Sequence, residues 1–127
     1  MDRALVDAVL VVPGDRVLEM PSFTVASGID AGKLLLADPG DTDAISCAAD
    51  TVALGLLTTH QHMGQRVPDD YAIAGFDGTY ISDTAAPGLT TLGSTAGRRV
   101  EASLALLEDG SGDVVLKPEL VVRGSSG

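Results

Sequence analysis

The sequence predicts an α/β protein built on a parallel β-sheet. Short apolar segments bounded by turn residues alternate with longer segments whose apolar residues recur at helical intervals. The resulting strand, helix, strand, helix order is typical of a parallel sheet with crossover helices. The chain of 127 residues is also 45% hydrophobic, which is enough to form a buried core.

The first half of the chain alternates helical and extended patterns. The predicted helices are Asp2–Val9, Val25–Leu36 and Thr51–Met63. The predicted strands are Arg16–Met20 and Ala44–Ala48, the second of which is expected to be buried. Thr24 and Asp50 are expected to cap the helices that follow them, because their side chains accept hydrogen bonds from free helix amides. Gly64 is expected to end the third helix.

The second half of the chain continues the alternation. The predicted strands are Tyr71–Phe76, Leu89–Leu92, Val114–Leu116 and Leu120–Val122, and the predicted helix is Ala96–Leu107. Residues Thr79–Gly88 form a loop long enough to suggest a function or an interface, and Gly124–Gly127 are expected to fray. Ligands of such sheets bind beyond the carboxyl ends of the strands. Three loops satisfy this rule: the loop with Phe23, the loop at Ala49-Asp50 and the loop that starts at Asp77.

Composition and charge exclude several classes of protein. The formal net charge is −10, from 18 Asp and Glu against 8 Lys and Arg. This balance argues against direct binding to a nucleic-acid backbone or to an anionic membrane, because both need clustered basic residues. No apolar run approaches the roughly 18 residues of a membrane span. The single cysteine, Cys47, cannot form an intrachain disulfide, and no signal peptide is recognisable, so we expect a cytoplasmic protein.

Catalytic and metal-binding motifs are not evident. His60 and His62 are two residues apart, so they point in different directions on a helix, and we expect surface or half-buried histidines rather than zinc ligands. Residues Gly93–Gly97 resemble a nucleophile elbow only loosely, and Ser94 or Thr95 more simply caps the following helix. Cys47 is expected to be a small buried hydrophobe. We therefore predict a protein that is not an enzyme and uses no cofactor or metal.

Two residues remain as candidates for ligand binding. Asp77 directly follows a predicted strand, where a carboxylate can accept hydrogen bonds from two ligand hydroxyls. Its alternative role is an Asx turn with Gly78. Phe23 lies in a loop beside a strand end, where its ring could stack on a sugar or a base. The alternative is that its ring only packs in a small hydrophobic cluster beside the main core.

Five segments resemble the LacI/GalR type of transcriptional repressor. The most specific is Gln65–Asp77, which is similar to the pattern G-x-R-V-P-x-D-hydrophobic-G-F-D of that family. The other four occur in the order in which the family has them: Phe23–Gly28 (FTVASG), Ala44–Gly55 (AISCAADTVALG), Leu89–Thr91 (LTT) and Leu116–Ser125 (LKPELVVRGS). Any one of these matches is weak, but five in order cover nearly the whole chain.

The resemblance implies a fold and a division of the chain. Family members have a helix-turn-helix head and a two-lobed effector domain similar to periplasmic sugar-binding proteins of type I. The expected fold is therefore a truncated parallel-sheet, Rossmann-like lobe, without a helix-turn-helix domain. Residues 1–88 would form most of the C-terminal lobe, residues 89–113 a crossover toward the other lobe, and residues 114–127 the closing strands and tail. The apolar face of the crossover helix would then lack its usual cover.

The resemblance also assigns roles to individual residues. Asp77 matches the aspartate that binds the effector, and Phe23 matches the aromatic residue that stacks on it. Ala49 stands where many members carry Asn or Asp, so one contact with the effector is missing or different. Gly78 replaces a common second Asp. The residues that match the dimer contact of the family are Leu54, Asp83, Thr84 and Ala85.

Two functional hypotheses follow from the resemblance. In the first, the chain is the effector-sensing and dimerisation portion of a LacI/GalR-like repressor that binds a small molecule, most simply a sugar, and reaches DNA only through a missing N-terminal domain. In the second, it is a free-standing binding or interaction module that dimerises with a full-length relative. A secreted sugar-binding protein is disfavoured because no signal peptide is recognisable.

Overall fold

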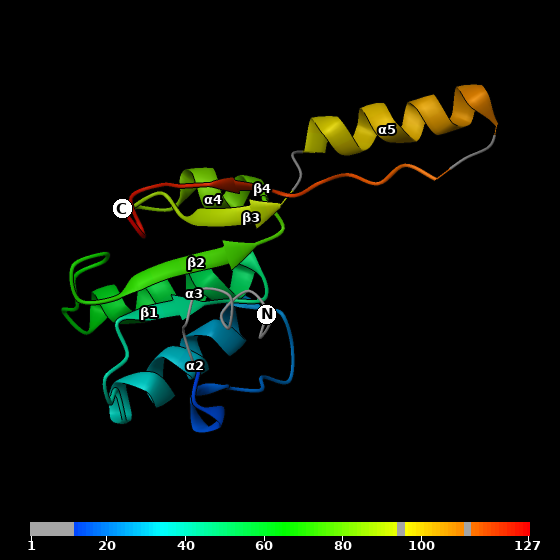
Figure 1. The fold of residues 1–127 in the computed structure, drawn as a ribbon. Coiled ribbons are helices and arrows are strands. Elements are labelled where there is room, and N and C mark those ends of the chain that lie inside the picture. Colours follow the sequence, from blue (N-terminus) through cyan, green and yellow to red (C-terminus); the bar gives the residue numbers. More distant parts are fainter. Residues whose placement is uncertain (1–11, 94–95, 111–112) are drawn as a thin grey trace.

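A computed structural model of the chain describes residues 12–93, 96–110 and 113–127 (Figure 1). It forms a four-stranded sheet in the order β1-β2-β3-β4. Strands β1 (Ala44–Ser46), β2 (Ala72–Phe76) and β3 (Thr90–Gly93) are parallel, and β4 (Glu119–Val121) pairs antiparallel with β3. The helical segments are η1 (Gly14–Arg16), α2 (Val25–Ala37), α3 (Asp50–His62), α4 (Tyr80–Thr84) and α5 (Ala96–Asp109). This arrangement confirms the predicted α/β fold class.

Helix α2 begins and packs as its sequence predicts. Thr24 adopts extended backbone angles, and its hydroxyl accepts a hydrogen bond from the amide of Ser27, so Thr24 is the N-cap. The buried face of α2 consists of small residues and packs against α3. A methyl group added to Gly28 would lie 2.0 Å from the carbonyl oxygen of Val52. The two helix backbones are therefore in contact, which only glycine allows at this position.

Helix α3 covers one face of the sheet and supplies most of the core. Its buried residues Ala53, Leu56 and Leu57 pack with Ile73 of β2 and with Leu89. At its C-terminal end Gly64 has a φ of +78°, and the amide of Gln65 bonds to the carbonyl of His60. This geometry is a glycine C-terminal cap, so the predicted helix end is confirmed.

The opposite face of the sheet is open among the residues that the structure describes. Along β2, Ile73 and Gly75 are buried, whereas Phe76 on the other face is 44% exposed. Along β1, only Ile45 is even half-buried. The prediction of a fully buried strand over Ala44–Ala48 is therefore wrong, because helices of the described chain cover the sheet on one face only.

Four other predictions about elements are wrong. Residues 17–20 form no strand, because no described strand pairs with them, and Arg16 ends η1 instead. The loop over Thr79–Gly88 contains α4, and Val114–Leu116 is not a strand. The tail is not frayed: Ser125 is fully buried and its hydroxyl donates to the carbonyl of Ile73 at 2.6 Å. The predictions for Asp2–Val9 and for a cap at Ser94 or Thr95 lie outside the described residues.

Helix α5 and residues 113–118 extend away from the sheet as an arm (Figure 1). The side chains of Val100, Leu104 and Leu107 are 58%, 54% and 80% exposed. An ion pair between Arg98 and Glu119 ties α5 to the first residue of β4. Among the described residues nothing covers the apolar stripe of α5, in agreement with the expectation that this face is left uncovered. No helix among the described residues is long and apolar enough to cross a membrane.

Candidate functional site

The carboxyl ends of the parallel strands bring the candidate residues to one edge of the sheet. Ala49 and Asp50 follow β1, Asp77 follows β2, and Gly93 ends β3. The register pairs Ser46 with Ala74 and Phe76 with Leu92, so these ends are neighbours. The amide of Asp77 donates to the carbonyl of Leu92 at 2.9 Å and extends the contact between β2 and β3 by one residue.

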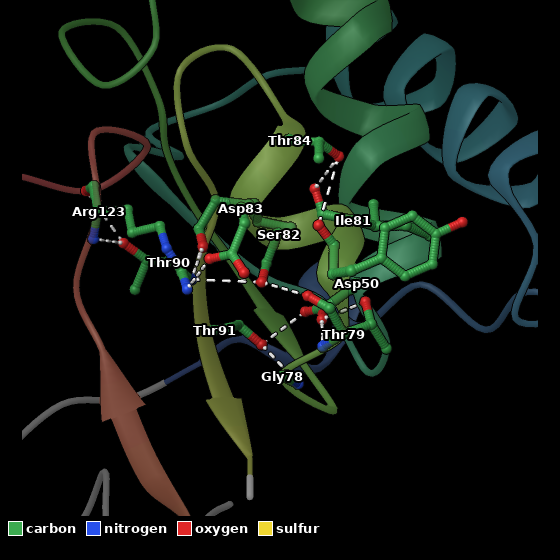
Figure 2. Close-up of polar contacts among 12 residues, drawn as sticks. Asp50, Gly78, Thr79, Ile81, Ser82, Asp83, Thr84, Thr90, Thr91 and Arg123 are labelled. Carbon is green, nitrogen blue, oxygen red and sulfur yellow. Dashed lines mark hydrogen bonds and ion pairs between the residues drawn. The ribbon is translucent and has the colours of Figure 1, made fainter. Parts of the chain in front are cut away.

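Asp50 occupies the centre of this edge, in a role that the sequence does not predict. The N-cap of α3 is Ala49, so Asp50 is the first helical residue rather than the cap. Its carboxylate is 1% exposed and accepts three hydrogen bonds (Figure 2). The amide and the hydroxyl of Thr79 donate to Oδ2 at 2.7 and 2.8 Å, and the hydroxyl of Thr91 donates to Oδ1 at 2.6 Å. A buried carboxylate requires such donors to offset its lost hydration.

Asp77 lies in a turn with a backbone conformation that is rare for a residue with a side chain. Its φ is +102°, in the region that favours glycine. The next two amides are already bonded elsewhere, that of Gly78 to the hydroxyl of Thr91 and that of Thr79 to Asp50. An Asx turn needs the amide of Thr79, so the carboxylate of Asp77 does not serve as an Asx-turn acceptor.

A cavity of about 300 Å³ adjoins Asp77. Its other lining residues are Phe76, Gly93, Arg99, Leu116 and Pro118. Arg99 reaches from α5 to the carbonyl of Asp77, which places a guanidinium beside the turn. A methyl group added to Gly93 would lie 2.5 Å from the carbonyl carbon of Asp77, so the turn and β3 meet at backbone distance. An acidic residue, Asp77, and a basic residue, Arg99, therefore both line this cavity.

The backbone of Phe23 is hydrogen-bonded to the start of α3, the helix that begins at this edge of the sheet. Its carbonyl accepts a hydrogen bond of 2.6 Å from the hydroxyl of Thr51, the second residue of α3. Its side chain is 71% exposed, which contradicts the alternative of a core contact. An exposed phenylalanine held at a fixed point beside a polar edge can serve as a stacking surface.

Ala49 is buried, at 5% exposed, and provides no side-chain cap for α3. The structure brings Ala49 and the loop of Phe23 to the same end of α3. Asp77 is connected to that end through Thr79 and Asp50. Segments that carry the three predicted ligand-binding positions are thus all connected to the start of α3.

A second polar cluster, centred on Arg123, lies next to this edge (Figure 2). The guanidinium donates to the carbonyl of Leu89 at 2.8 Å and to the hydroxyl of Ser82 at 3.3 Å, and it forms an ion pair with Asp83. A cavity of about 230 Å³ adjoins the cluster, lined by Gly78, Tyr80, Asp83, Thr91, Gly93, Val121 and Arg123. Sequence reasoning did not single out Arg123, although the motif LKPELVVRGS contains it, because its partners on α4 and at Leu89 are distant in sequence.

The predicted dimer residues fall on two elements that pack together. Leu54 is on α3, Asp83 and Thr84 are on α4, and Ala85 follows α4. Asp83 and Thr84 are exposed, whereas Ala85 packs against the core.

His60 and Cys47 are both buried. His60 is fully buried, which corrects the prediction of a surface or half-buried histidine. Its Nδ1 donates to the carbonyl of Leu56 at 3.0 Å, and the ring packs edge-on against Tyr71. Its Nε2 has no hydrogen-bond partner within the part of the chain that the structure describes. Burial lowers the pKa of His60 and raises the pKa of Cys47 to about 12. The described residues contain no cluster of His, Cys, Asp or Glu that could hold a metal ion.

The chain has the features of an open α/β protein: a mostly parallel sheet, with an acidic residue and a cavity at the carboxyl ends of its parallel strands. Proteins of this class bind ligands at that end of the sheet. The chain belongs to the periplasmic binding protein-like domain family, whose profile matches residues 10–126. The truncated periplasmic-binding-protein-like fold that we expected is thereby confirmed.

The relatives are transcriptional regulators of the LacI family. The repressor CytR of Escherichia coli K12 is 36% identical over 113 residues, which cover 82% of this chain and 33% of CytR. A LacI-family regulator from Sanguibacter keddieii superposes with a TM-score of 0.83 at 30% identity and covers 98% of this chain and 49% of its own. The regulator CelR, solved with cellobiose, superposes with a TM-score of 0.77 at 28% identity, over 98% of this chain and 40% of CelR.

These comparisons confirm the resemblance to the LacI/GalR type. The chain spans about a third of the length of the curated relatives it matches, so it covers only part of their architecture. The relatives are regulators rather than enzymes, which agrees at the level of the family with the prediction that the chain is not an enzyme.

Proposed function

We propose that this chain is the effector-sensing portion of a LacI/GalR-like transcriptional repressor. One observation carries the proposal: Asp77 lines a cavity at the carboxyl ends of the parallel strands. The exposed ring of Phe23 belongs to a loop fixed at the same helix start. This is the place where open α/β sheets bind ligands.

The chemistry of the site favours a small molecule rich in hydroxyl groups, most simply a sugar. The carboxylate of Asp77 would accept hydrogen bonds from two hydroxyls, each contributing about 1.5–3 kcal/mol. The ring of Phe23 would stack on the apolar face of the ligand. The methyl group of Ala49 donates and accepts no hydrogen bond, so the ligand would lack a polar partner at that position. CelR in complex with cellobiose supports a sugar as the first class to test.

In this proposal the chain works as part of a two-lobed cytoplasmic regulator. Residues 1–88 form most of one lobe, residues 89–113 cross toward the second lobe, and residues 114–127 return to the first. Leu54, Asp83, Thr84 and Ala85 contribute to contacts within a homodimer. Effector binding changes the populations of open and closed lobes, and a separate N-terminal domain reads the DNA.

Isothermal titration calorimetry with cellobiose and lactose tests the proposal. We expect weak binding, because half of a cleft supplies only part of the contact with a ligand. Asp77→Ala should lower the affinity at least about a hundredfold, because it removes both charged hydrogen bonds to the ligand. Asp69→Ala is the matched control, because Asp69 is an exposed carboxylate on the loop between α3 and β2. Equal affinities of the Asp77 and Asp69 variants would remove Asp77 from the site.

A second candidate function is an interaction module that pairs with a longer relative. The uncovered apolar stripe of α5, with Leu104 and Leu107 at its centre, favours this alternative. Mixing the chain with a purified full-length LacI-type relative and separating the species by size-exclusion chromatography tests it. A joint peak that Leu104→Lys disrupts would support the module. Elution of both proteins at their separate positions would exclude pairing with that relative.

A further inference from the structure

The turn formed by residues 77–79 is held from two elements at once. From α3, the carboxylate of Asp50 binds both the amide and the hydroxyl of Thr79. From β3, the hydroxyl of Thr91 accepts from the amide of Gly78 and donates to the other carboxylate oxygen of Asp50. The four residues form one network in which every hydrogen bond ends at Asp50 or at Thr91 (Figure 2).

The turn needs this support because of the conformation of Asp77. A non-glycine residue with a φ of +102° persists only where its surroundings determine the conformation. The network fixes the two residues that follow Asp77, and the bond from the amide of Asp77 to Leu92 fixes the residue itself. Asp50 lies 29 positions from Thr79 and 41 from Thr91, so it links parts of the chain that no local turn rule connects.

The carboxylate of Asp50 is buried, so it is available to hold the turn over residues 77–79 but not to bind a ligand. At 1% exposure it cannot contact a ligand from solvent, and all three of its donors lie outside its own helix. Gly75 allows the approach, because a methyl group there would lie 2.4 Å from Oδ1 of Asp50. A polar group this deeply buried needs hydrogen-bond donors, and Thr79 and Thr91 supply them here.

We propose that Asp50 is the positioning residue of the effector site: it fixes the turn over residues 77–79 and thereby holds Asp77 on the wall of the cavity. The part of this inference that concerns an effector rests on the proposed function. The part that concerns the turn stands on the hydrogen-bond network alone. The two parts can therefore be tested separately on the full 127-residue chain.

The first test measures the turn by nuclear magnetic resonance of the amides. Asp50→Ala removes the acceptor of the Thr79 amide, so hydrogen exchange at Thr79 should accelerate at least about tenfold. The amide resonances of Gly78 and Thr79 should also move. Asp50→Asn keeps one oxygen for Thr79, and its amide group can donate to the rotated hydroxyl of Thr91, so this variant should restore most of the protection. Ile73→Val is the control for general destabilisation, because Ile73 is fully buried in β2 outside the network.

The second test measures cellobiose binding by the same variants. Asp50→Ala should weaken cellobiose binding about as much as Asp77→Ala does, Asp50→Asn should recover most of the affinity, and Ile73→Val should leave it unchanged. Unaltered exchange and resonances at residues 78 and 79 in Asp50→Ala would overturn the proposal. An altered turn with full cellobiose affinity, in a chain where Asp77→Ala loses binding, would overturn it as well. If no variant and not even the parent chain binds cellobiose or lactose, the proposed sugar effector fails, and the exchange at Thr79 alone decides whether Asp50 positions the turn.

Discussion

The contact between the backbones of α2 and α3 predicts that Gly28→Ala destabilises the chain. The added methyl group would lie 2.0 Å from the carbonyl oxygen of Val52 and 2.9 Å from its carbonyl carbon. Both atoms belong to the backbone of α3, so no side chain can rotate to make room. The helices must separate by at least about 1 Å, and a gap of that size forfeits a quarter to a half of each dispersion contact across it.

Two opposing effects set how much Gly28→Ala lowers the free energy of unfolding. Overpacking a core costs about 1–3 kcal/mol, and the upper end applies here because the obstacle is backbone. Alanine stabilises a helix interior by about 1 kcal/mol relative to glycine. The free energy of unfolding should therefore fall by about 2 kcal/mol. For a chain of this size, that change lowers the melting temperature by about 6–10 °C.

Urea and thermal unfolding followed by far-UV circular dichroism measure this effect. Gly97→Ala is the matched control, because Gly97 also lies in a helix and has nothing within 4 Å of the position of its added methyl group. That variant should be neutral or slightly stabilised. A Gly28→Ala chain as stable as the Gly97→Ala chain would refute the close approach of α2 and α3.

Three further predictions concern His60, Ala49 and Cys47. Burial lowers the pKa of His60, so below about pH 6.5 the unfolded chain binds more protons than the folded one. The contribution of the neutral His60 to the free energy of unfolding is fully present above that pH. It is lost as the pH falls toward the lower pKa of the folded state, by at most about 1.4 kcal/mol per pH unit. Urea titrations at several pH values should show this dependence and lose it in His60→Leu; an unchanged dependence would exclude His60 as its source. Ala49→Ser should stabilise the chain by about 1 kcal/mol, because Ala49 already has extended N-cap angles and lacks only the acceptor; a lower urea midpoint would show that the site has no room for the hydroxyl. The thiol of Cys47, with a pKa of about 12 and 7% exposure, should react with a thiol reagent only after unfolding in urea, and rapid labelling of the native chain would contradict its burial.

Local rules predicted the helices because helices depend on neighbouring residues. Thr24 caps α2 and Gly64 ends α3 as expected, since each of these roles is decided within a few positions. The strand predicted over Arg16–Met20 failed for the opposite reason. A strand exists only when another strand pairs with it, and no described strand pairs with this segment.

For the candidate site, local patterns indicated which residues to consider but not how they are held. Asp77 follows β2, as the sequence predicts, whereas the strand expected before Phe23 does not form and Phe23 is held instead by the hydrogen bond from Thr51. Asp50 was predicted to be the N-cap of α3, because aspartate is favoured at that position. Its carboxylate instead binds Thr79 and Thr91, which are distant in sequence, so this role is visible only in the folded chain.

The buried Ser125 has a consequence for the order of folding. Its hydroxyl binds Ile73, 52 positions earlier, and its backbone binds Gly88 and Ile73. Contacts across so long a loop form after the local ones, because closing the loop costs chain entropy before the contacts repay it. We therefore expect the bonds of Ser125 to form mainly after the transition state of folding. A substitution of Ser125 should then speed unfolding and change the rate of folding little, which stopped-flow refolding and unfolding rates would measure.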